Sequence, residues 1–314
     1  MAILITGSSG YLGTELCRRF ERESSVEQVI GVDLVPPRES FSKLTFYEKD
    51  CTGDLSSIFQ TRPVDILIHL VFILDPIHDS QKMLRVNLGS LENVLSQVKT
   101  SGTRRVVVTS SYTAYGAHAD NPPLLKEDHP LRGNEDFQYA RDKTLVEEKL
   151  RRFGENNPGV EMIVVRPAVV VGAHMGNFIS RYISKRWVPV VKDSGTEIQF
   201  LHEEDAAEAL FRLSMEAPPG AYNVGPPDTL HPSEVARIMG GGTLALRPGL
   251  LRALTGFGWT FRLRFLSETP KSMIDFIQYP CVVDGTKIER ETGFRYRYSS
   301  REAVEALAGR KNSG

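Results

Sequence analysis

Cysteine is scarce in this chain of 314 residues and occurs only as Cys17, Cys51 and Cys281. Three widely spaced cysteines do not make a disulfide framework, and they lack the paired spacing of an ordinary zinc site. Such sparse usage is typical of proteins that work in a reducing compartment. We therefore expect a cytoplasmic location and no bound metal.

Long apolar runs are also missing. The most apolar stretch, residues 64–74, is interrupted by Asp65 and His69 and is much shorter than the roughly 20 residues that cross a bilayer. The opening residues, MAILITG, have no basic segment ahead of their apolar side chains, as a secretory signal peptide would have. From these absences we expect no membrane partner.

Neither sign of charge is in excess. The 38 Lys+Arg residues face 39 Asp+Glu residues, and the formal net charge of −1 gives none of the basic surplus that nucleic-acid binding needs. Hydrophobic residues make up 41% and charged residues 25%, which is ordinary for a globular protein. A small molecule, and no nucleic acid, is therefore the expected partner.

What the sequence does contain is a regular alternation of two patterns. Short β-branched runs alternate with longer segments of helical periodicity, and the runs are apolar on consecutive residues, as in parallel strands covered on both faces. Strands are predicted at residues 2–6, 28–32, 44–48, 65–70, 105–109, 161–165 and 221–224, and helices at about 11–22, 80–100, 137–153, 203–215, 249–265 and 301–307. This order predicts an α/β fold with a Rossmann-type, doubly wound parallel sheet.

The pattern loosens after residue 165, where Pro167, Gly172 and Pro189 interrupt a long irregular stretch. We therefore predict two domains. Residues 1–165 form a dinucleotide-binding domain to which 203–225 return. Residues 166–202 and 226–314 form a smaller, mixed substrate-binding domain over the carboxyl edge of the sheet.

A glycine-rich turn, TGSSGYLG, follows the first predicted strand and leads into a helix. Gly7, Gly10 and Gly13 allow a tight turn and a close approach of the backbone to a pyrophosphate, which the helix N-terminus attracts. Asp33 stands 20 residues after Gly13 at the end of the second strand, where a carboxylate accepts hydrogen bonds from the ribose and repels a 2′-phosphate. These features favour NAD over NADP. The alternative is that Asp33 binds no ribose and is only a turn residue ahead of two prolines.

A tyrosine and a lysine, Tyr139 and Lys143, are four residues apart in a predicted helix and share one face. A nearby ammonium favours the phenolate form of a tyrosine, which can then exchange a proton with a substrate hydroxyl. Upstream, the run Thr109-Ser110-Ser111 places hydroxyls at the carboxyl end of a strand, where doubly wound sheets bind ligands.

With these motifs the chain resembles the extended short-chain dehydrogenases/reductases of the NAD-dependent epimerase/dehydratase family over nearly its full length. Further matching features are His69 and Leu70 after the fourth strand, Asn87 in the next helix, and the segments Arg166-Pro167, Phe200-Leu201-His202-Glu203-Glu204-Asp205 and Tyr222-Asn223-Val224-Gly225.

The resemblance implies a set of site residues and a homodimer. Tyr139 is implied as the acid/base, Lys143 as its electrostatic partner and ribose ligand, and Ser111 as a donor to the reacting oxygen. Cofactor contacts are implied at Gly7, Ser9, Gly10, Tyr11, Leu12, Gly13, Asp33, Asp50, Cys51, Leu70, Asn87, Thr109, Tyr139, Lys143, Pro167, Ala168 and Val169. Substrate contacts are implied at Phe72, Ser111, Tyr112, Thr113, His174 and Asn177.

Three departures from the family pattern bear on the substrate. Tyr112-Thr113 replace the Asp-Glu of sugar-nucleotide dehydratases, which disfavours dehydration. Ile198 stands where nucleotide-sugar epimerases commonly carry an arginine for the diphosphate, and Phe72 is bulkier than usual. The first hypothesis is an epimerase or oxidoreductase of a nucleotide sugar. The alternatives are a ketoreductase of a less polar molecule and a redox sensor that binds dinucleotide without catalysis.

Overall fold

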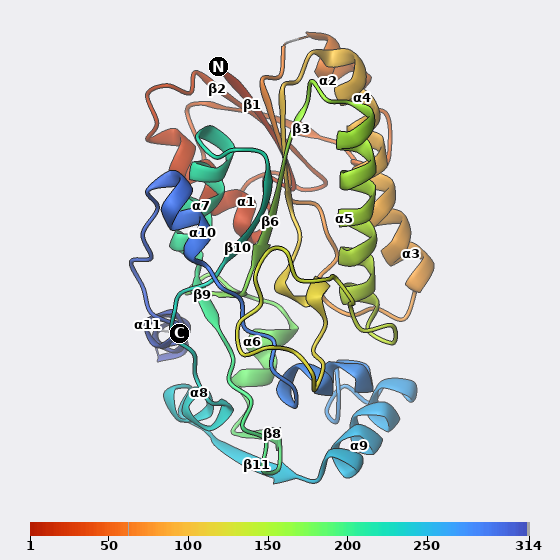
Figure 1. The fold of residues 1–314 in the computed structure, drawn as a ribbon, viewed down its shortest axis with the longest axis vertical. Coiled ribbons are helices and arrows are strands. Elements are labelled where there is room, and N and C mark those ends of the chain that lie inside the picture. Colours follow the sequence, from red (N-terminus) through yellow and green to blue (C-terminus); the bar gives the residue numbers. More distant parts are fainter. Residues whose placement is uncertain (62, 313–314) are drawn as a thin grey trace.

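A seven-stranded, fully parallel sheet forms the centre of the molecule (Figure 1). The computed structural model describes residues 1–61 and 63–312. The strand order is β10-β6-β5-β4-β1-β2-β3. These strands are β1 (Ala2–Thr6), β2 (Gln28–Asp33), β3 (Leu44–Glu48), β4 (Ile66–His69), β5 (Arg105–Thr109), β6 (Glu161–Pro167) and β10 (Gly220–Val224).

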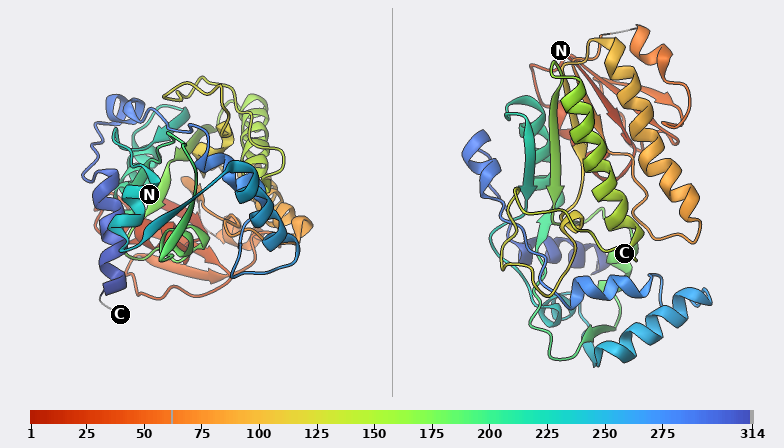
Figure 2. Two further views of the ribbon diagram at one scale, coloured as in Figure 1. Left: turned by 90° about the horizontal axis from the view of Figure 1, so that it is seen from below. Right: turned by 45° about the vertical axis from the view of Figure 1, so that its right-hand side comes forward.

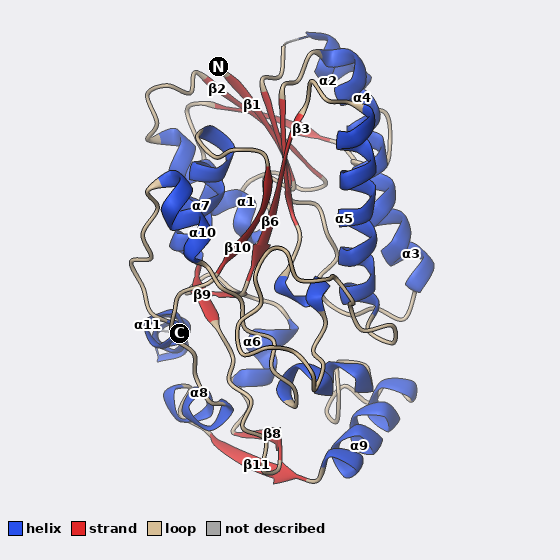
Figure 3. Cartoon of the chain, viewed as in Figure 1, coloured by secondary structure: helices blue, strands red, loops and turns tan. Residues whose placement is uncertain are grey.

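Helices cover both faces of this sheet (Figure 3). On one face lie α1 (Tyr11–Glu21), α7 (Glu203–Met215) and α10 (Thr286–Thr292); on the other lie α2 (Ser56–Thr61), α4 (Ser90–Ser101) and α5 (Gln138–Asn156). Ile3 and Ile5 of β1 belong to the first core and Leu4 to the second. The consecutive apolar residues of β1 therefore follow from burial on both faces.

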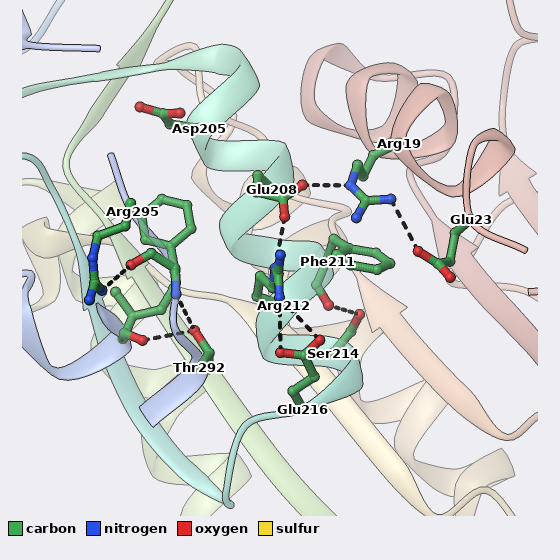
Figure 4. A network of polar contacts seen from close by, with 12 residues as sticks. Arg19, Glu23, Asp205, Glu208, Phe211, Arg212, Ser214, Glu216, Thr292 and Arg295 are labelled. Carbon is green, nitrogen blue, oxygen red and sulfur yellow. Dashed lines mark hydrogen bonds and ion pairs between the residues drawn. The ribbon is translucent and has the colours of Figure 1, made fainter. Parts of the chain in front are cut away.

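Polar contacts fix α7 beside α1 although the two helices are far apart in sequence (Figure 4). The Arg19 guanidinium lies 3.5 Å from the centroid of the Phe211 ring, and its Nε donates to Glu208 at 2.5 Å. Glu208 also accepts from Arg212 at 2.8 Å. Because β10 follows α7 and pairs with β6, residues 203–224 complete the sheet that the first half of the chain begins.

The remaining elements lie mostly beyond the carboxyl ends of the strands (Figure 2). β7 (Val169–Val171) pairs with β9 (Phe200–His202), and β8 (Trp187–Val191) pairs with β11 (Gly242–Leu246). The helical elements there are η2 (Tyr112–Tyr115), α6 (Phe178–Ile183), α8 (Pro232–Ile238), α9 (Pro248–Thr260), η3 (Lys271–Ile277) and α11 (Ser300–Asn312). The division into two domains stays a prediction, and its last two residues, 313 and 314, lie outside the described part.

The predicted fold class is confirmed. Every predicted strand is present to within two residues, but the four short strands β7, β8, β9 and β11 fall in segments that we predicted as irregular or mixed. The predicted helix at 80–100 is α3 (Ser80–Leu84), a π-helical turn η1 (Arg85–Gly89) and α4. Among the described helices, none has both the length and the apolar character needed to cross a bilayer.

Candidate functional site

The site lies where the order of the sheet reverses. β1 and β4 are neighbours, and the chain leaves their carboxyl ends in different directions, at Gly7 and Leu70, which is where doubly wound sheets bind ligands. A cavity of about 260 Å³ opens there. The predicted site residues that line it are Gly7, Gly10, Tyr11, Leu12, Gly13, Leu70, Phe72, Thr109, Ser111, Tyr112, Thr113, Tyr139, Lys143, Pro167, Ala168, Val169 and Asn177.

The glycine-rich turn has a geometry that only glycine allows at two positions. Gly7 has a φ of +77°, and its N–H donates to the Val32 carbonyl at 2.8 Å. A Cβ on Gly13 would lie 2.1 Å from the Gly7 carbonyl oxygen, so the first turn of α1 packs directly on the loop. The Ser9 hydroxyl is buried there without a described hydrogen-bond partner. The turn thus presents a helix N-terminus and an unpaired polar atom to an anionic ligand.

Asp33 lies at the carboxyl end of β2, next to this turn. Its Oδ2 accepts from the Ser9 N–H at 3.0 Å and its Oδ1 from the Leu34 N–H at 2.7 Å. Each oxygen keeps a second lone pair, so the carboxylate is held in one orientation and can still accept hydrogen bonds from a ribose.

Five predicted cofactor contacts are not among the residues that line the cavity: Ser9 and Asp33, described above, and Asp50, Cys51 and Asn87. Asp50 is exposed, and its Oδ1 accepts from the N–H and hydroxyl of Thr52, both at 2.8 Å. Cys51 is buried, and burial raises the pKa of its thiol to about 12. Asn87 is fully buried: its amide accepts from the Ile73 N–H at 2.8 Å and donates to Asp142 at 3.0 Å. Asn87 therefore connects the loop after β4 to α5.

Tyr139, Lys143 and Ser111 converge in the cavity. A hydrogen bond joins the Tyr139 and Ser111 side chains and lowers the pKa of the phenol, but burial outweighs it and raises that pKa to about 12. Lys143 Nζ donates to the Thr109 carbonyl at 2.8 Å. Burial lowers the pKa of the Lys143 ammonium to about 7, against the opposing effect of Glu147 and Asp142. The arrangement brings together a neutral phenol, a hydroxyl and a buried amine whose charge is easily changed.

Phe72 covers the amine. Lys143 Nζ lies 3.5 Å from the centroid of the Phe72 ring, and this ring packs edge to face with Tyr139 at a centroid distance of 5.2 Å. The bulky residue after β4 therefore excludes water from Lys143 and orients Tyr139.

A buried ion pair that we did not predict supports these residues. Glu147, one turn after Lys143, receives Arg166 Nε at 2.9 Å and Nη2 at 2.6 Å, and its Oε1 also accepts from the Ser110 hydroxyl at 2.5 Å. The pair ties α5 to β6 and to the Ser110-Ser111 turn. A sequence signal did exist, because residues 139, 143 and 147 share one face of a helix.

His174, one of the predicted substrate contacts, lies beside two carboxylates. Its Nδ1 lies 2.8 Å from a Glu203 oxygen and 3.1 Å from a Glu15 oxygen, and it is not among the residues that line the cavity. Two buried carboxylates attract the imidazole away from the cavity. His202, by contrast, caps α7 by accepting from the Glu204 N–H at 3.2 Å, as expected for a structural role.

A second hollow of about 100 Å³ continues outward from the cavity, with Tyr112, Val169, Phe178, Ile179 and Met273 lining both. Ile198 lines this outer hollow, where the resemblance would place an arginine. The other lining side chains are mostly apolar and include Tyr182, Ile183, Phe200, Leu266, Ile274, Phe276 and Ile277.

Two charges at the outer hollow belong to different elements. Lys185 lines it directly. Arg181, on the nearby helix α6, is engaged elsewhere: it donates to Asp75 at 2.9 Å and to Glu268 at 2.8 Å. The charged residues that line the outer hollow are thus Lys185 and Glu268, which already accepts from Arg181, and the rest of the wall is mostly apolar.

Sequence reasoning missed part of the lining. Apart from Ser110, the unpredicted residues are apolar, namely Leu74, Phe137, Val170, Phe178, Ile179 and Met273. Phe137 and Phe178 adjoin predicted site residues, which is a usable signal. Met273 comes from η3, and nothing in its local sequence indicates a place in the cavity.

Comparison with known proteins gives one result for the sequence and one for the fold. An uncharacterized protein of Mycobacterium tuberculosis is 25% identical over 317 residues, covering 96% of this chain and 82% of that protein. UDP-glucose 4-epimerase of Thermotoga maritima, solved with UDP-glucose, matches with a TM-score of 0.79 at 16% identity, over 100% of this chain and 99% of that one. The UDP-glucose 4-epimerase of Thermus thermophilus, solved with NAD, has the same TM-score at 17% identity, over 100% of both chains.

The sequence profile described as the NAD dependent epimerase/dehydratase family matches residues 3–225. This range contains the glycine-rich turn, Asp33, Ser111, Tyr139 and Lys143. The resemblance drawn from the motifs is confirmed, and with it NAD as the cofactor of the family. The chain belongs to the NAD-dependent epimerase/dehydratase family of enzymes.

Proposed function

We propose that this enzyme transfers hydride between NAD and a hydroxyl- or keto-bearing carbon, with Ser111, Tyr139 and Lys143 as the reacting groups of the protein. The observation that carries the proposal is the convergence of these three side chains in one cavity that ends at the glycine-rich turn. It supports an active enzyme over a redox sensor, because a sensor has no need of a dry amine beside a tyrosine.

The residues around the cavity fit NAD. The unpaired Ser9 hydroxyl and the N-terminus of α1 suit a pyrophosphate, and Asp33 suits a ribose diol without a 2′-phosphate. The bound dinucleotide would supply a hydride acceptor or donor.

Tyr139 would move the proton that accompanies the hydride. With its pKa raised to about 12 by burial, the phenol is protonated at neutral pH and can donate to a ketone oxygen. In the direction of alcohol oxidation, a charged Lys143 would favour loss of that proton. Ser111, hydrogen-bonded to Tyr139, would hold the reacting oxygen beside the phenol.

Two substrate classes compete. The names of the UDP-glucose 4-epimerases that share the fold favour a nucleotide sugar, which was our first hypothesis. The outer hollow favours the alternative, a less polar hydroxy or keto compound, because Ile198 replaces the expected arginine and Arg181 is already paired with two carboxylates. Each lost charge-assisted contact to a diphosphate costs about 1.5–3 kcal/mol. We therefore propose the less polar class.

Thermal stabilisation of the NAD-loaded enzyme distinguishes the two classes. UDP, UDP-glucose and thymidine diphosphate sugars should leave the midpoint of unfolding unchanged, whereas apolar secondary alcohols should raise it and produce NADH. Stabilisation by a nucleoside diphosphate alone would overturn the apolar assignment. NAD that stays bound through purification would favour epimerisation, and free exchange would favour a dehydrogenase.

A further inference from the structure

The four exposed aromatic side chains in the described part of the chain all belong to the end of the molecule opposite the N-terminus. Three of them, Phe257, Phe261 and Phe265, are 53%, 62% and 84% exposed. With Leu250 and Leu254 they follow one another at intervals of three or four residues along α9 and the turn after it. We call these five residues the α9 face.

The α9 face is not the side by which the helix packs on the protein. Leu251, Thr255 and Gly258 are the buried residues of α9, and they lie on an adjacent side, about 100° around the helix, toward η3 and the outer hollow. The apolar residues of the α9 face are thus not the ones that pack the helix on the rest of the protein. Five large apolar side chains gathered on one exposed surface usually mark an interaction site.

Arginines predominate among the charged residues around this face. Residues 242–267 contain four arginines and no aspartate or glutamate. Arg247 precedes the face and Arg262 lies between Phe261 and Phe265; both are exposed and form no ion pair with any described acidic residue. Arg264 is also exposed and lies 3.7 Å from Glu268, while Arg252 is paired with Asp275.

We propose that the α9 face docks on the surface of an anionic lipid bilayer. Exposed Phe and Leu side chains flanked by arginines suit this surface, because the apolar groups enter the acyl boundary while the guanidinium groups stay among the lipid phosphates. A second copy of this chain that docked by the same face would bring the exposed arginines of the two chains together, which disfavours that occupant.

Helix α9 and the turn after it form part of the wall of the outer hollow, so docking on a membrane would affect access to that hollow. Thr255 on its inner side, and Leu266, Ser267 and Thr269 just after Phe265, form part of the wall of the outer hollow. Figure 2 shows α9 at the outer margin of the molecule. Docking would therefore bring the apolar hollow close to the membrane. The sequence predicted no membrane partner from the lack of a spanning segment, and this proposal revises that expectation for a helix lying on the surface.

Vesicle co-sedimentation of the NAD-loaded protein tests the proposal without any turnover. We expect binding to vesicles of equal parts phosphatidylcholine and phosphatidylglycerol, falling as salt is added, and much weaker binding to phosphatidylcholine alone. The variant Leu254→Ser/Phe257→Ser/Phe261→Ser should bind the mixed vesicles at least about tenfold more weakly. Arg247→Gln/Arg262→Gln should lose about fivefold per arginine on the mixed vesicles only.

The matched control is Leu124→Ser/Leu145→Ser, which removes apolar side chains that are 49% and 40% exposed elsewhere on the surface. It should bind vesicles like the wild type, and NAD affinity reports whether each variant is folded. Absence of wild-type binding, or equal binding by the triple serine variant, would overturn the proposal. So would a dimer that the triple variant dissociates, because the α9 face would then be covered by a second copy. Because vesicle binding is measured without turnover, these outcomes test membrane docking even if the hydride-transfer proposal is wrong.

Discussion

At the scale of single residues, the proposed acid/base role of Tyr139 depends on one hydroxyl group. The Tyr139→Phe variant keeps the ring that packs on Phe72 and loses only the group that hydrogen-bonds with Ser111. We expect NAD affinity close to wild type and turnover lowered by roughly 10²–10⁴-fold, the usual contribution of general acid/base transfer. NAD titration and steady-state rates on one preparation measure both. Activity within a fewfold of wild type would remove Tyr139 from the mechanism.

Lys143 links the site to the pH dependence of stability. Its folded pKa of about 7 lies below its ordinary value of 10.5, so between these values the unfolded chain holds one more proton. Stability therefore rises with pH in this window, by at most about 1.4 kcal/mol per pH unit. We expect urea unfolding without NAD to show this slope in the wild type relative to Lys143→Met. The buried thiols oppose the trend equally in both proteins, and parallel curves would contradict the lowered pKa.

Asp33 is the residue that we propose sets the choice between NAD and NADP. Asp33→Ala should weaken NAD binding by about 1.5–3 kcal/mol and narrow the gap to NADP, because both the ribose hydrogen bonds and the repulsion of a 2′-phosphate are lost. Asp33→Asn is the matched control, since it keeps an acceptor for the Ser9 or Leu34 N–H but not the charge. Calorimetric titration with both dinucleotides decides, and tighter binding of NADP by the wild type would contradict the assignment.

At the scale of elements, the buried Glu147–Arg166 pair joins α5 to β6 beneath the reacting groups. Both side chains are only 6% exposed, so Arg166→Met leaves a buried carboxylate without its partner. Such a loss typically costs 3–5 kcal/mol. By contrast, Arg151→Ala, which breaks surface contacts of the same helix, should cost under about 1 kcal/mol. Chemical denaturation measures both, and similar losses would mean that the buried pair contributes little.

The main strands were predictable because each is an apolar run covered on both sides. Burial of that kind requires consecutive apolar residues, such as Val106, Val107 and Val108. The strand β9 has only three residues, and its pairing with β7 depends on a partner 31 residues away. Hydrophobic periodicity and composition do not indicate which distant segment a short strand pairs with, so the sequence predicted an irregular stretch there.

The site divides in the same way. The turn, Asp33, Ser111, Tyr139 and Lys143 were predictable because each follows a strand end or shares a helix face, which local sequence specifies. Met273 and Phe276 reach the outer hollow from η3 through tertiary packing alone. The place of His174 depended on two carboxylates, of Glu15 and Glu203, that come from distant helices.

At the scale of the whole molecule, the return of residues 203–224 to the sheet determines when the protein can fold during synthesis. Until β10 emerges from the ribosome, β6 is an open edge, and the surface of α1 that packs on α7 faces water. A stalled chain whose part outside the ribosome ends at residue 202 should therefore aggregate or recruit chaperones, whereas one whose part outside the ribosome ends at residue 230 should resist protease in its first half. Ribosome-stalled chains with these two exposed lengths would be treated with protease. The pattern of cleavage would show whether residues 203–224 must leave the ribosome before the dinucleotide-binding part can fold.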